Sequence, residues 1–384
     1  MYYFDYAAST PLLPAASEVF YTLSERCFGN TSSLHEFGGE AQNMLAYARN
    51  ELAGMLGVEA DGIYFTGGGT EGNLLTLISL AKANRHRGSH LIMSAGEHPS
   101  VDSAMDYLKM EGFSVTTVPF GNDGILDLDL LEQAIQEETI LLSVQHINPE
   151  IGTIQPIEEI AGLIAGRGIL FHSDCVQSFG KVDVRPLANW VDAMTVSSHK
   201  VYGPKGVGAV YIHPKHRFSP VFPGVVHEGG FRGGTVNVPG IAAFVTAAKT
   251  AIDEESENLL YHSLRQAFYD KIKNIKEFFT IYEASEPEKQ LPQIIGLGIK
   301  RVEGQLIMLE LNRHGFAIST GSACQVGQQH ASKTMVAMKI DPQIAKEFIR
   351  ISFGRDTTVE SVELLADRLI QVARQLAPYT EING

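Results

Sequence analysis

The stretch "TVSSHKVYGPKGVGA", residues 195–209, has a lysine directly after an apolar run that is typical of a buried strand. The run at residues 193–196 precedes Lys200, and a Tyr-Gly-Pro turn follows it. A charge at the end of a buried strand costs free energy unless it is paired or used. Because ligands of open α/β sheets bind beyond the carboxyl ends of strands, this position indicates a functional site.

The chain around this stretch alternates short apolar runs with helical patterns over the first 250 residues, which favours a parallel sheet wrapped by helices. Helical patterns lie at 73–85 and 128–136. The fold class is therefore α/β. The predicted strands are residues 62–66, 90–94, 114–120, 139–146, 168–174, 193–198 and 207–213.

The pattern changes after Pro239 to a long helical stretch, residues 240–275, and then to short strands and amphipathic helices. This change predicts a large domain, residues 15–254, and a smaller α+β domain built from residues 1–14 and 255–384. The last helix, residues 359–377, is expected to begin with a capping box of Thr357 and Glu360.

The composition argues against several classes of function. The 384 residues carry a formal net charge of −14 and no basic cluster, so nucleic acid is not an expected partner. No apolar run approaches the roughly 18 residues of a membrane helix, and the first residues lack a signal-peptide pattern, which predicts a cytoplasmic protein without a membrane span. Three widely spaced cysteines predict neither a disulfide nor a metal site.

Polar residues follow several of the predicted strands. After residues 62–66, the glycine-rich run 67–72 enters a helix, and its backbone N–H groups with the Thr70 hydroxyl would suit a phosphate; an ordinary turn is an equal alternative. Asp174 follows another strand and needs a cation or a donor, which a helix N-terminus could also supply. His98 follows a third strand, where a lone histidine is more often structural than catalytic.

Lys200 and Asp174 together indicate a specific cofactor. A lysine that loses its proton through burial attacks carbonyl groups, and the known use of such a lysine beside an acid is a Schiff base with pyridoxal phosphate (PLP). The acid would pair with the pyridinium nitrogen. The alternative is a solvated lysine with Lys205 as its companion. Three residues are expected at the phosphate and one stacked on the ring: Thr70, Ser197, His199 and His98.

Eight motifs in the chain resemble those of one known family, in order and near the expected spacing. The family is the cysteine desulfurases of the NifS/IscS type, class V members of the aminotransferase-like fold (fold type I PLP enzymes), and the resemblance runs from residue 4 to about residue 354. The motifs are "DYAAST", "FTGGGTEGN", "GEHPS", "HINPEIGTIQ", "HSDCVQSFGK", "SSHKVYGPKGVGA", "RGGT" and "STGSACQVG".

The resemblance implies a homodimer with PLP on Lys200 and Asp174 at its ring nitrogen. It adds Gln177 as a donor to the ring oxygen, and Gly69 and the partner subunit's Thr235 at the phosphate. It makes Arg350 the clamp for the substrate carboxylate, where a structural salt bridge would otherwise be the better interpretation.

Cys324 decides the reaction that the resemblance implies. It lies in "STGSACQVGQQHASK", whose small and polar residues predict a mobile loop. The Cys324 thiolate would take sulfur from L-cysteine as a persulfide and leave L-alanine, with His98 handling a proton. Cys175 and Cys27 are interpreted as unreactive.

One departure from the family pattern affects the substrate site. Pro149 stands where most relatives have an asparagine, and Gln177 and Asn148 are the nearest residues that could compensate. This variant resembles a NifS-like branch linked to quinolinate synthase and NAD biosynthesis, so the expected sulfur acceptors are an iron–sulfur scaffold or quinolinate synthase. The alternatives are a selenocysteine lyase, an aminotransferase, a kynureninase-like hydrolase and a non-catalytic scaffold.

Overall fold

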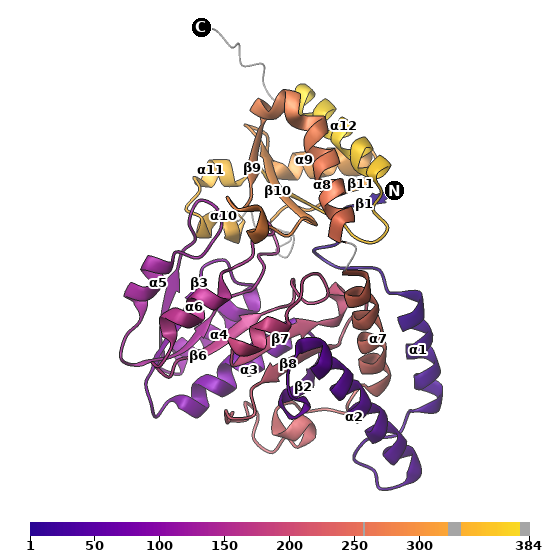
Figure 1. Cartoon of the computed structure of the whole chain (residues 1–384), viewed down its shortest axis with the longest axis vertical. Coiled ribbons are helices and arrows are strands. Elements are labelled where there is room, and N and C mark those ends of the chain that lie inside the picture. The colour runs from indigo at the N-terminus through magenta and orange to yellow at the C-terminus, as the bar shows by residue number, and fades with distance from the viewer. Residues whose placement is uncertain (256–257, 322–331, 377–384) are drawn as a thin grey trace.

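A computed structural model describes residues 1–255, 258–321 and 332–376. Figure 1 shows two lobes, a larger one around a seven-stranded sheet and a smaller one around a three-stranded sheet. The domain boundaries stay a prediction. One observation bears on them: Met335 and Met338, from the C-terminal part of the chain, pack into the core of the larger lobe.

The seven predicted strands of the large sheet all form. Only β8 runs antiparallel to its neighbours, so the sheet is mixed and mostly parallel. In spatial order the strands are β2 (Ile63–Thr66), β8 (Gly208–Ile212), β7 (Ala193–Ser197), β6 (Leu170–Asp174), β5 (Thr139–Ser143), β3 (His90–Ser94) and β4 (Ser114–Val118).

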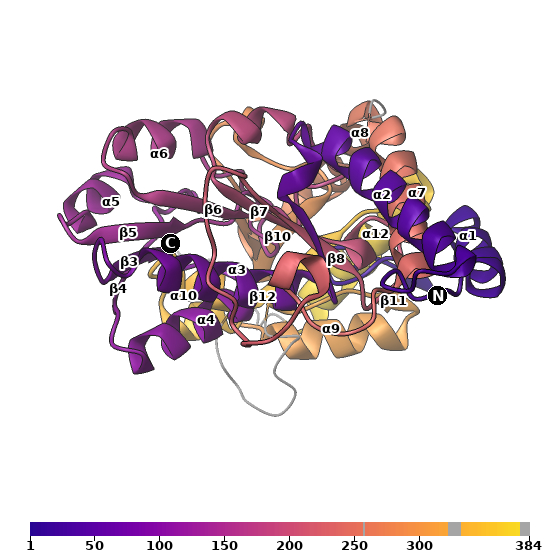
Figure 2. The same ribbon diagram turned by 90° about the horizontal axis from the view of Figure 1, so that it is seen from below.

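Helices cover both faces of this sheet, as Figure 2 shows. One face packs against α2 (Glu36–Leu56), α6 (Ile157–Ile164) and α7 (Val238–Glu255), and the other against α3 (Gly69–Asn84) and α4 (Pro99–Met110). Successive side chains of a strand point to opposite faces, so Met194 and Val196 join the first core while Ala193 joins the second. The short helix α5 (Leu128–Ala134) lies at the β4 edge.

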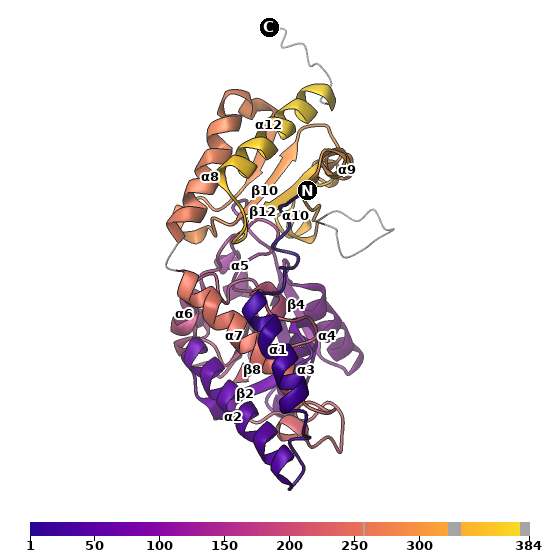
Figure 3. The same cartoon turned by 90° about the vertical axis from the view of Figure 1, so that its right-hand side faces the viewer.

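The smaller lobe is an antiparallel sheet of β12 (Phe348–Ser352), β10 (Ile294–Ile299) and β9 (Phe279–Tyr282), visible in Figure 3. Its core includes Phe268 of α8 and Leu365 of α12. The other helices of this lobe are α8 (Asn258–Ile272), α9 (Gly304–Arg313) and α12 (Val359–Leu376). The short helices α10 (Lys333–Ala337) and α11 (Pro342–Ala345) pack on the core of the larger lobe. The stretch predicted as one helix at 240–275 is described as α7 and α8, on either side of residues 256–257.

The first residues of the chain connect the two lobes. Strand β1 (Tyr2–Tyr3) pairs with β11 (Phe316–Ala317) beside the smaller lobe, and α1 (Pro14–Arg26) lies against α7 in the larger one. Between them, residues 5–10 form what we call the crossing segment. It is held at both ends, because the Ser352 N–H donates to Phe4 O at 2.8 Å and the Thr10 N–H donates to His199 O at 3.1 Å.

Candidate active site

The carboxyl ends of six strands lie at one edge of the large sheet, because all its strands except β8 run in the same direction. Asp174 ends β6, and Lys200 follows the end of β7. These two strands are adjacent, with Asp174 opposite Thr195. The prediction that Lys200 and Asp174 come from neighbouring strands is therefore confirmed.

Gly208 brings the glycine-rich turn next to Ser197. It pairs with Thr66 on one side and with Ser197 on the other, and a Cβ at this position would lie 2.8 Å from the backbone of Gly68. Only glycine allows that approach. A Cβ on Gly69 would lie 3.5 Å from the Ser197 Cβ, so the first turn of α3 faces Ser197.

The polar groups at this turn fit a bound phosphate. Helix α3 begins at Gly69 after Gly68, and no side chain caps its first N–H groups. The Ser197 hydroxyl is buried and has no hydrogen-bond partner among the described residues. A buried unpaired hydroxyl costs about 1–3 kcal/mol. An anion at this helix N-terminus would satisfy both the N–H groups and the hydroxyl. Thr70 lies exposed in the same turn.

Asp174 is held by donors in a position suited to a ring nitrogen. It is 6% exposed; its Oδ1 accepts from the Val176 N–H at 2.9 Å and its Oδ2 from Asn73 Nδ2 at 2.7 Å. A carboxylate can accept about four hydrogen bonds, so capacity remains for a protonated ring nitrogen. Asn73 was not among the residues expected from the sequence, although it ends the motif "FTGGGTEGN" and lies one helical turn after Gly69.

His98 is connected to the same carboxylate. It is the N-cap residue of α4, and its Nδ1 accepts from the Ser100 N–H at 3.2 Å. The Ser100 hydroxyl lies 2.7 Å from this Nδ1 and 3.0 Å from Asn73 Nδ2, which completes a path to Asp174. Burial lowers the pKa of His98, against the attraction of Asp174. The imidazole is therefore neutral at neutral pH, with its proton on Nε2.

The crossing segment forms one wall of the site. Lys200 Nζ donates to Ala7 O at 2.5 Å and to Ala8 O at 2.9 Å, and Gln177 Nε2 donates to Ala7 O at 3.3 Å. His199 Nδ1 lies 3.3 Å from Ser9 Oγ. Burial and the nearby charge of Lys200 lower the pKa of His199 to about 4, so it too is neutral. The sequence motif "DYAAST" thus contributes backbone carbonyls.

Arg350 reaches the site from the smaller lobe. It is 7% exposed on β12; its Nη2 contacts Asp5 Oδ1 at 2.7 Å and its Nη1 donates to Pro149 O at 2.9 Å. The structural salt bridge considered from the sequence therefore exists, with Asp5. The Nε–H of Arg350 is buried without a partner among the described residues, which leaves a donor for a substrate carboxylate.

Comparison with known proteins identifies this arrangement. The family model described as aminotransferase class-V matches residues 2–365. The chain belongs to the class-V aminotransferase family. It is 44% identical over 366 residues to "Putative cysteine desulfurase NifS" of Bacillus subtilis, covering 95% of this chain and 93% of that one. It is 36% identical to "Cysteine desulfurase IscS" of Dictyoglomus turgidum, covering 99% and 97%.

The fold of this class-V protein agrees with its sequence relatives. A solved structure named "NIFS-LIKE PROTEIN" superposes with a TM-score of 0.89 at 31% identity and covers 98% of this chain and 100% of that one. The expectations of an aminotransferase-like fold and of the NifS/IscS type of cysteine desulfurase are confirmed. Class-V enzymes use PLP, and the donors at the α3 N-terminus, Ser197, Asp174 and Lys200 fit that group.

Three residues expected in the class-V site have roles that the described contacts leave as predictions. Asn148 is fully buried; its Oδ1 accepts from the Glu150 N–H at 2.9 Å and its Nδ2 donates to Thr334 Oγ1 at 3.0 Å. Both polar atoms of the Asn148 side chain therefore already have partners. Its expected contact with the substrate stays a prediction. Thr235 is exposed before α7, and its role in a partner subunit stays a prediction. Cys324 lies outside the described residues.

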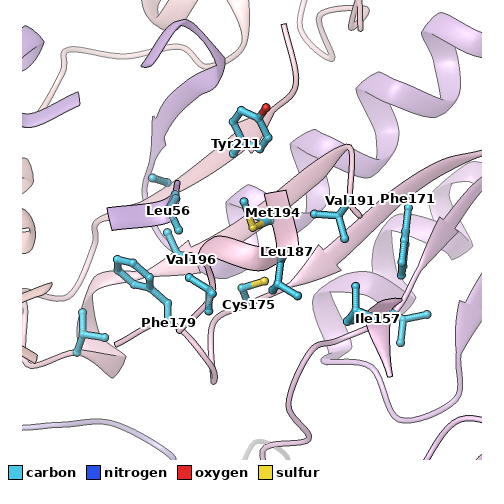
Figure 4. Packing of buried hydrophobic residues seen from close by; sticks show 14 of the residues in the cluster. Leu56, Ile157, Phe171, Cys175, Phe179, Leu187, Val191, Met194, Val196 and Tyr211 are labelled. Carbon is cyan, nitrogen blue, oxygen red and sulfur yellow. The ribbon is translucent and has the colours of Figure 1, made fainter. Parts of the chain in front are cut away.

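The two described cysteines are unsuited to nucleophilic catalysis. Cys175 is buried in the hydrophobic core with Phe179, Leu187 and Val196, as Figure 4 shows. Burial raises the pKa of Cys175 to about 12 and also raises the pKa of Cys27. Both are thiols at neutral pH.

The described residues contain neither a candidate metal site nor a candidate membrane span. In those parts of the chain no three His, Cys, Asp or Glu side chains gather into a group that could bind a metal ion. None of the helices there combines the length and apolar character needed to cross a membrane.

Proposed function

We propose that this protein is a PLP-dependent cysteine desulfurase that converts L-cysteine to L-alanine and stores the sulfur as a persulfide on Cys324. The observation that carries the proposal is the meeting of Lys200 and Asp174 beside an unpartnered Ser197 hydroxyl at a glycine-rich helix N-terminus. Identity of 36–44% to proteins named as cysteine desulfurases supports the choice of substrate.

The cofactor would be held by residues from three strand ends. Lys200 would carry it, Asp174 would keep its ring nitrogen protonated, and Gln177 would donate to its ring oxygen. When bound, PLP supplies an electron sink for charge that develops at the substrate Cα. The phosphate group would be bound by Gly69, Thr70, Ser197, His199 and Thr235 of the partner subunit.

The protein's own side chains would bind cysteine and move its protons. Arg350 offers its unpartnered Nε–H to the substrate carboxylate, while Asp5 and Pro149 O hold the guanidinium in place. Lys200 would take the Cα proton as general base. His98, neutral and protonated at Nε2, would exchange a proton with a thiol.

Cys324 would complete the reaction. Its thiolate attacks the substrate sulfur, so that a sulfur–sulfur bond forms, the C–S bond breaks and the electron pair stays on the substrate carbon. Protonation of that carbon gives alanine, so cysteine and the Cys324 thiol become alanine and a Cys324 persulfide. The sulfur would then pass to an acceptor protein, for which the sequence resemblance suggests an iron–sulfur scaffold or quinolinate synthase.

The described residues that flank the Cys324 segment support this assignment. A Cβ on Gly321 would lie 2.6 Å from the Ser332 Cβ, so the two flanks contact each other. Lys333 Nζ donates to Glu97 O at 2.6 Å and pairs with Asp102 of α4. The segment is therefore attached beside the helix that His98 caps.

We also propose that the active form is a homodimer. Large apolar side chains are exposed on α2 and on the connection before it: Phe28, Leu34, Phe37 and Tyr47. The rings of Phe28 and Phe37 stack with their centroids 5.2 Å apart, so these two exposed side chains form one apolar surface. Such a surface is typical of an interface, and a second copy of the chain would cover it.

Mass spectrometry of the PLP-loaded protein after incubation with L-cysteine tests the proposal. We expect one extra sulfur atom on the peptide that contains Cys324. Cys324→Ser should keep the visible absorbance of the bound cofactor and form no alanine, while the matched control Cys27→Ala should form alanine at the native rate. Alanine production by Cys324→Ser would remove Cys324 from the reaction.

A further inference from the structure

A second lysine lies beside the candidate active site and contacts Gln177. Gly180, with a φ of 70°, turns the chain after Gln177, and a Cβ there would lie 2.7 Å from Val201. The Lys181 side chain therefore folds back over the turn. Its Nζ donates to Gln177 O at 3.1 Å and also to Gln177 Oε1.

This contact fixes which end of the Gln177 amide faces Ala7 O, the carbonyl that Lys200 also contacts. A lysine ammonium can only donate, so it selects the amide oxygen. A neutral amine keeps the same donor contacts to Gln177 O and Oε1 in the observed geometry. The amide NH₂ is then directed the other way, where Nε2 donates to Ala7 O at 3.3 Å. The same carbonyl accepts from Lys200 Nζ at 2.5 Å. If the amide were reversed, its oxygen would lie next to Ala7 O, and two acceptors would face each other without a hydrogen bond.

The Nε2–Ala7 contact is long for a hydrogen bond, so this donor is weakly used. Gln177 is 4% exposed, and water cannot easily replace a missing partner there. We propose that Lys181 is a positioning residue, which holds the Gln177 amide with its NH₂ directed at Lys200 and at the ring oxygen of the cofactor. The inference rests on the proposed function, since it assumes that PLP binds at Lys200.

An effect of charge alone is the competing explanation. Burial lowers the pKa of Lys181 well below its ordinary value, and the nearby charges of Lys200 and Arg350 lower it further. A positive charge at Lys181 would in turn make Lys200 lose its proton more easily. The hydrogen bond to Gln177 needs no charge, however, because a neutral amine also donates.

The visible absorbance band of the bound cofactor, followed against pH, separates the two explanations. A donor to the ring oxygen favours the deprotonated form, so losing it should raise the midpoint of this titration. For one hydrogen bond we expect a rise of about one pH unit in Lys181→Met. Gln177→Leu should raise the midpoint equally, and Lys181→Met should add nothing in that background.

Two further variants complete the test. Lys181→Gln keeps a hydrogen-bond donor without a charge, so it should titrate with the native midpoint. This variant still tests the inference if Lys181→Met does not fold. Lys205→Met removes an exposed lysine close to Lys200 in the chain and should change nothing. An equal rise from Lys181→Met with and without Gln177, or no rise in either, would overturn the inference. Failure to bind PLP at all would instead contradict the proposed function.

Discussion

Asn73 joins the two ends of the polar path in the site, because its single NH₂ group donates to both Asp174 and Ser100. We expect Asn73→Leu, which keeps the size of the side chain, to lower PLP affinity about tenfold. The reason is that Asp174 Oδ2 loses its buried donor, at about 1.4 kcal/mol for a hydrogen bond to a charged group. Titration of the apoprotein with PLP measures the change.

Asn84 is the matched control, because it lies on the same helix and donates only to Leu80 O at 2.9 Å. Asn84→Leu should bind PLP as the native protein does. Native affinity in Asn73→Leu would show that Asp174 needs no donor from α3.

The buried His172 makes the stability of the protein depend on pH. It is fully buried between Ser143 Oγ at 2.9 Å and Thr195 Oγ1 at 3.0 Å, and burial lowers its pKa to about 4. Below about pH 6.5, His172 is protonated in the unfolded chain but stays neutral in the folded one. The free energy of unfolding therefore falls as pH falls. From pH 7 to pH 5 this group should cost about 2 kcal/mol.

The prediction is measured as a difference in free energy of unfolding between the native protein and His172→Asn. That difference should shrink by about 2 kcal/mol from pH 7 to pH 5, because the variant lacks the group. A constant difference for His172→Asn would mean that the buried imidazole accepts a proton in the folded state.

Three of the residues identified from the sequence share one property, which is that each lies at or just beyond the end of a predicted strand. Lys200, Asp174 and His98 could be found in this way because strand ends converge whatever the details of packing. Ser100 and the Ala7 carbonyl could not be found. Their roles depend on a helix cap and on a backbone path from a distant part of the chain, and neither leaves a side-chain signal.

At the scale of elements, Gly208 decides how β2 enters α3. We expect Gly208→Ala to destabilise the protein by about 1–3 kcal/mol, because its Cβ would meet the Gly68 backbone at 2.8 Å and backbone atoms cannot rotate away. PLP affinity should fall with it, since the turn that faces Ser197 must shift. Denaturant unfolding and PLP titration measure the two effects.

Gly39 on α2 provides the opposite case, because a Cβ there would meet nothing within 4 Å. Gly39→Ala should leave PLP affinity unchanged and stabilise the helix by about 0.5–1 kcal/mol. Equal stability of the two variants would contradict the close approach at Gly208.

The bounds of helices were harder to predict than the strands. Helix α3 begins at Gly69 and not at residue 73, because its glycine-rich first turn packs closely: a Cβ on Gly72 would lie 2.8 Å from Thr195 Cγ2. The glycines looked like a turn, yet packing requires them in a helix. The capping box of α12 also lies one residue later than predicted, with Thr358 and Ser361 exchanging hydrogen bonds.

For the whole molecule, the proposed dimer is the main prediction. Leu34 is fully exposed and lies between Phe28 and Phe37 in the chain, and the rings of these two residues stack. Leu34→Glu should weaken dimerisation at least tenfold, because it buries a charge that has no partner. Sedimentation velocity over a range of concentrations measures this. Met110→Glu changes an exposed side chain of α4 and should dimerise normally. A Leu34→Glu protein as dimeric as the native one would exclude this surface.

The crossing segment has a consequence for biosynthesis. Asp5 contacts Arg350, and the Phe4 carbonyl accepts from Ser352, so Asp5 takes a partner that is made 345 residues later. The large sheet, by contrast, is complete once Ile212 has been made. A nascent chain can therefore form its large sheet while Arg350 is still unmade, and the substrate clamp is complete only when that residue has been added.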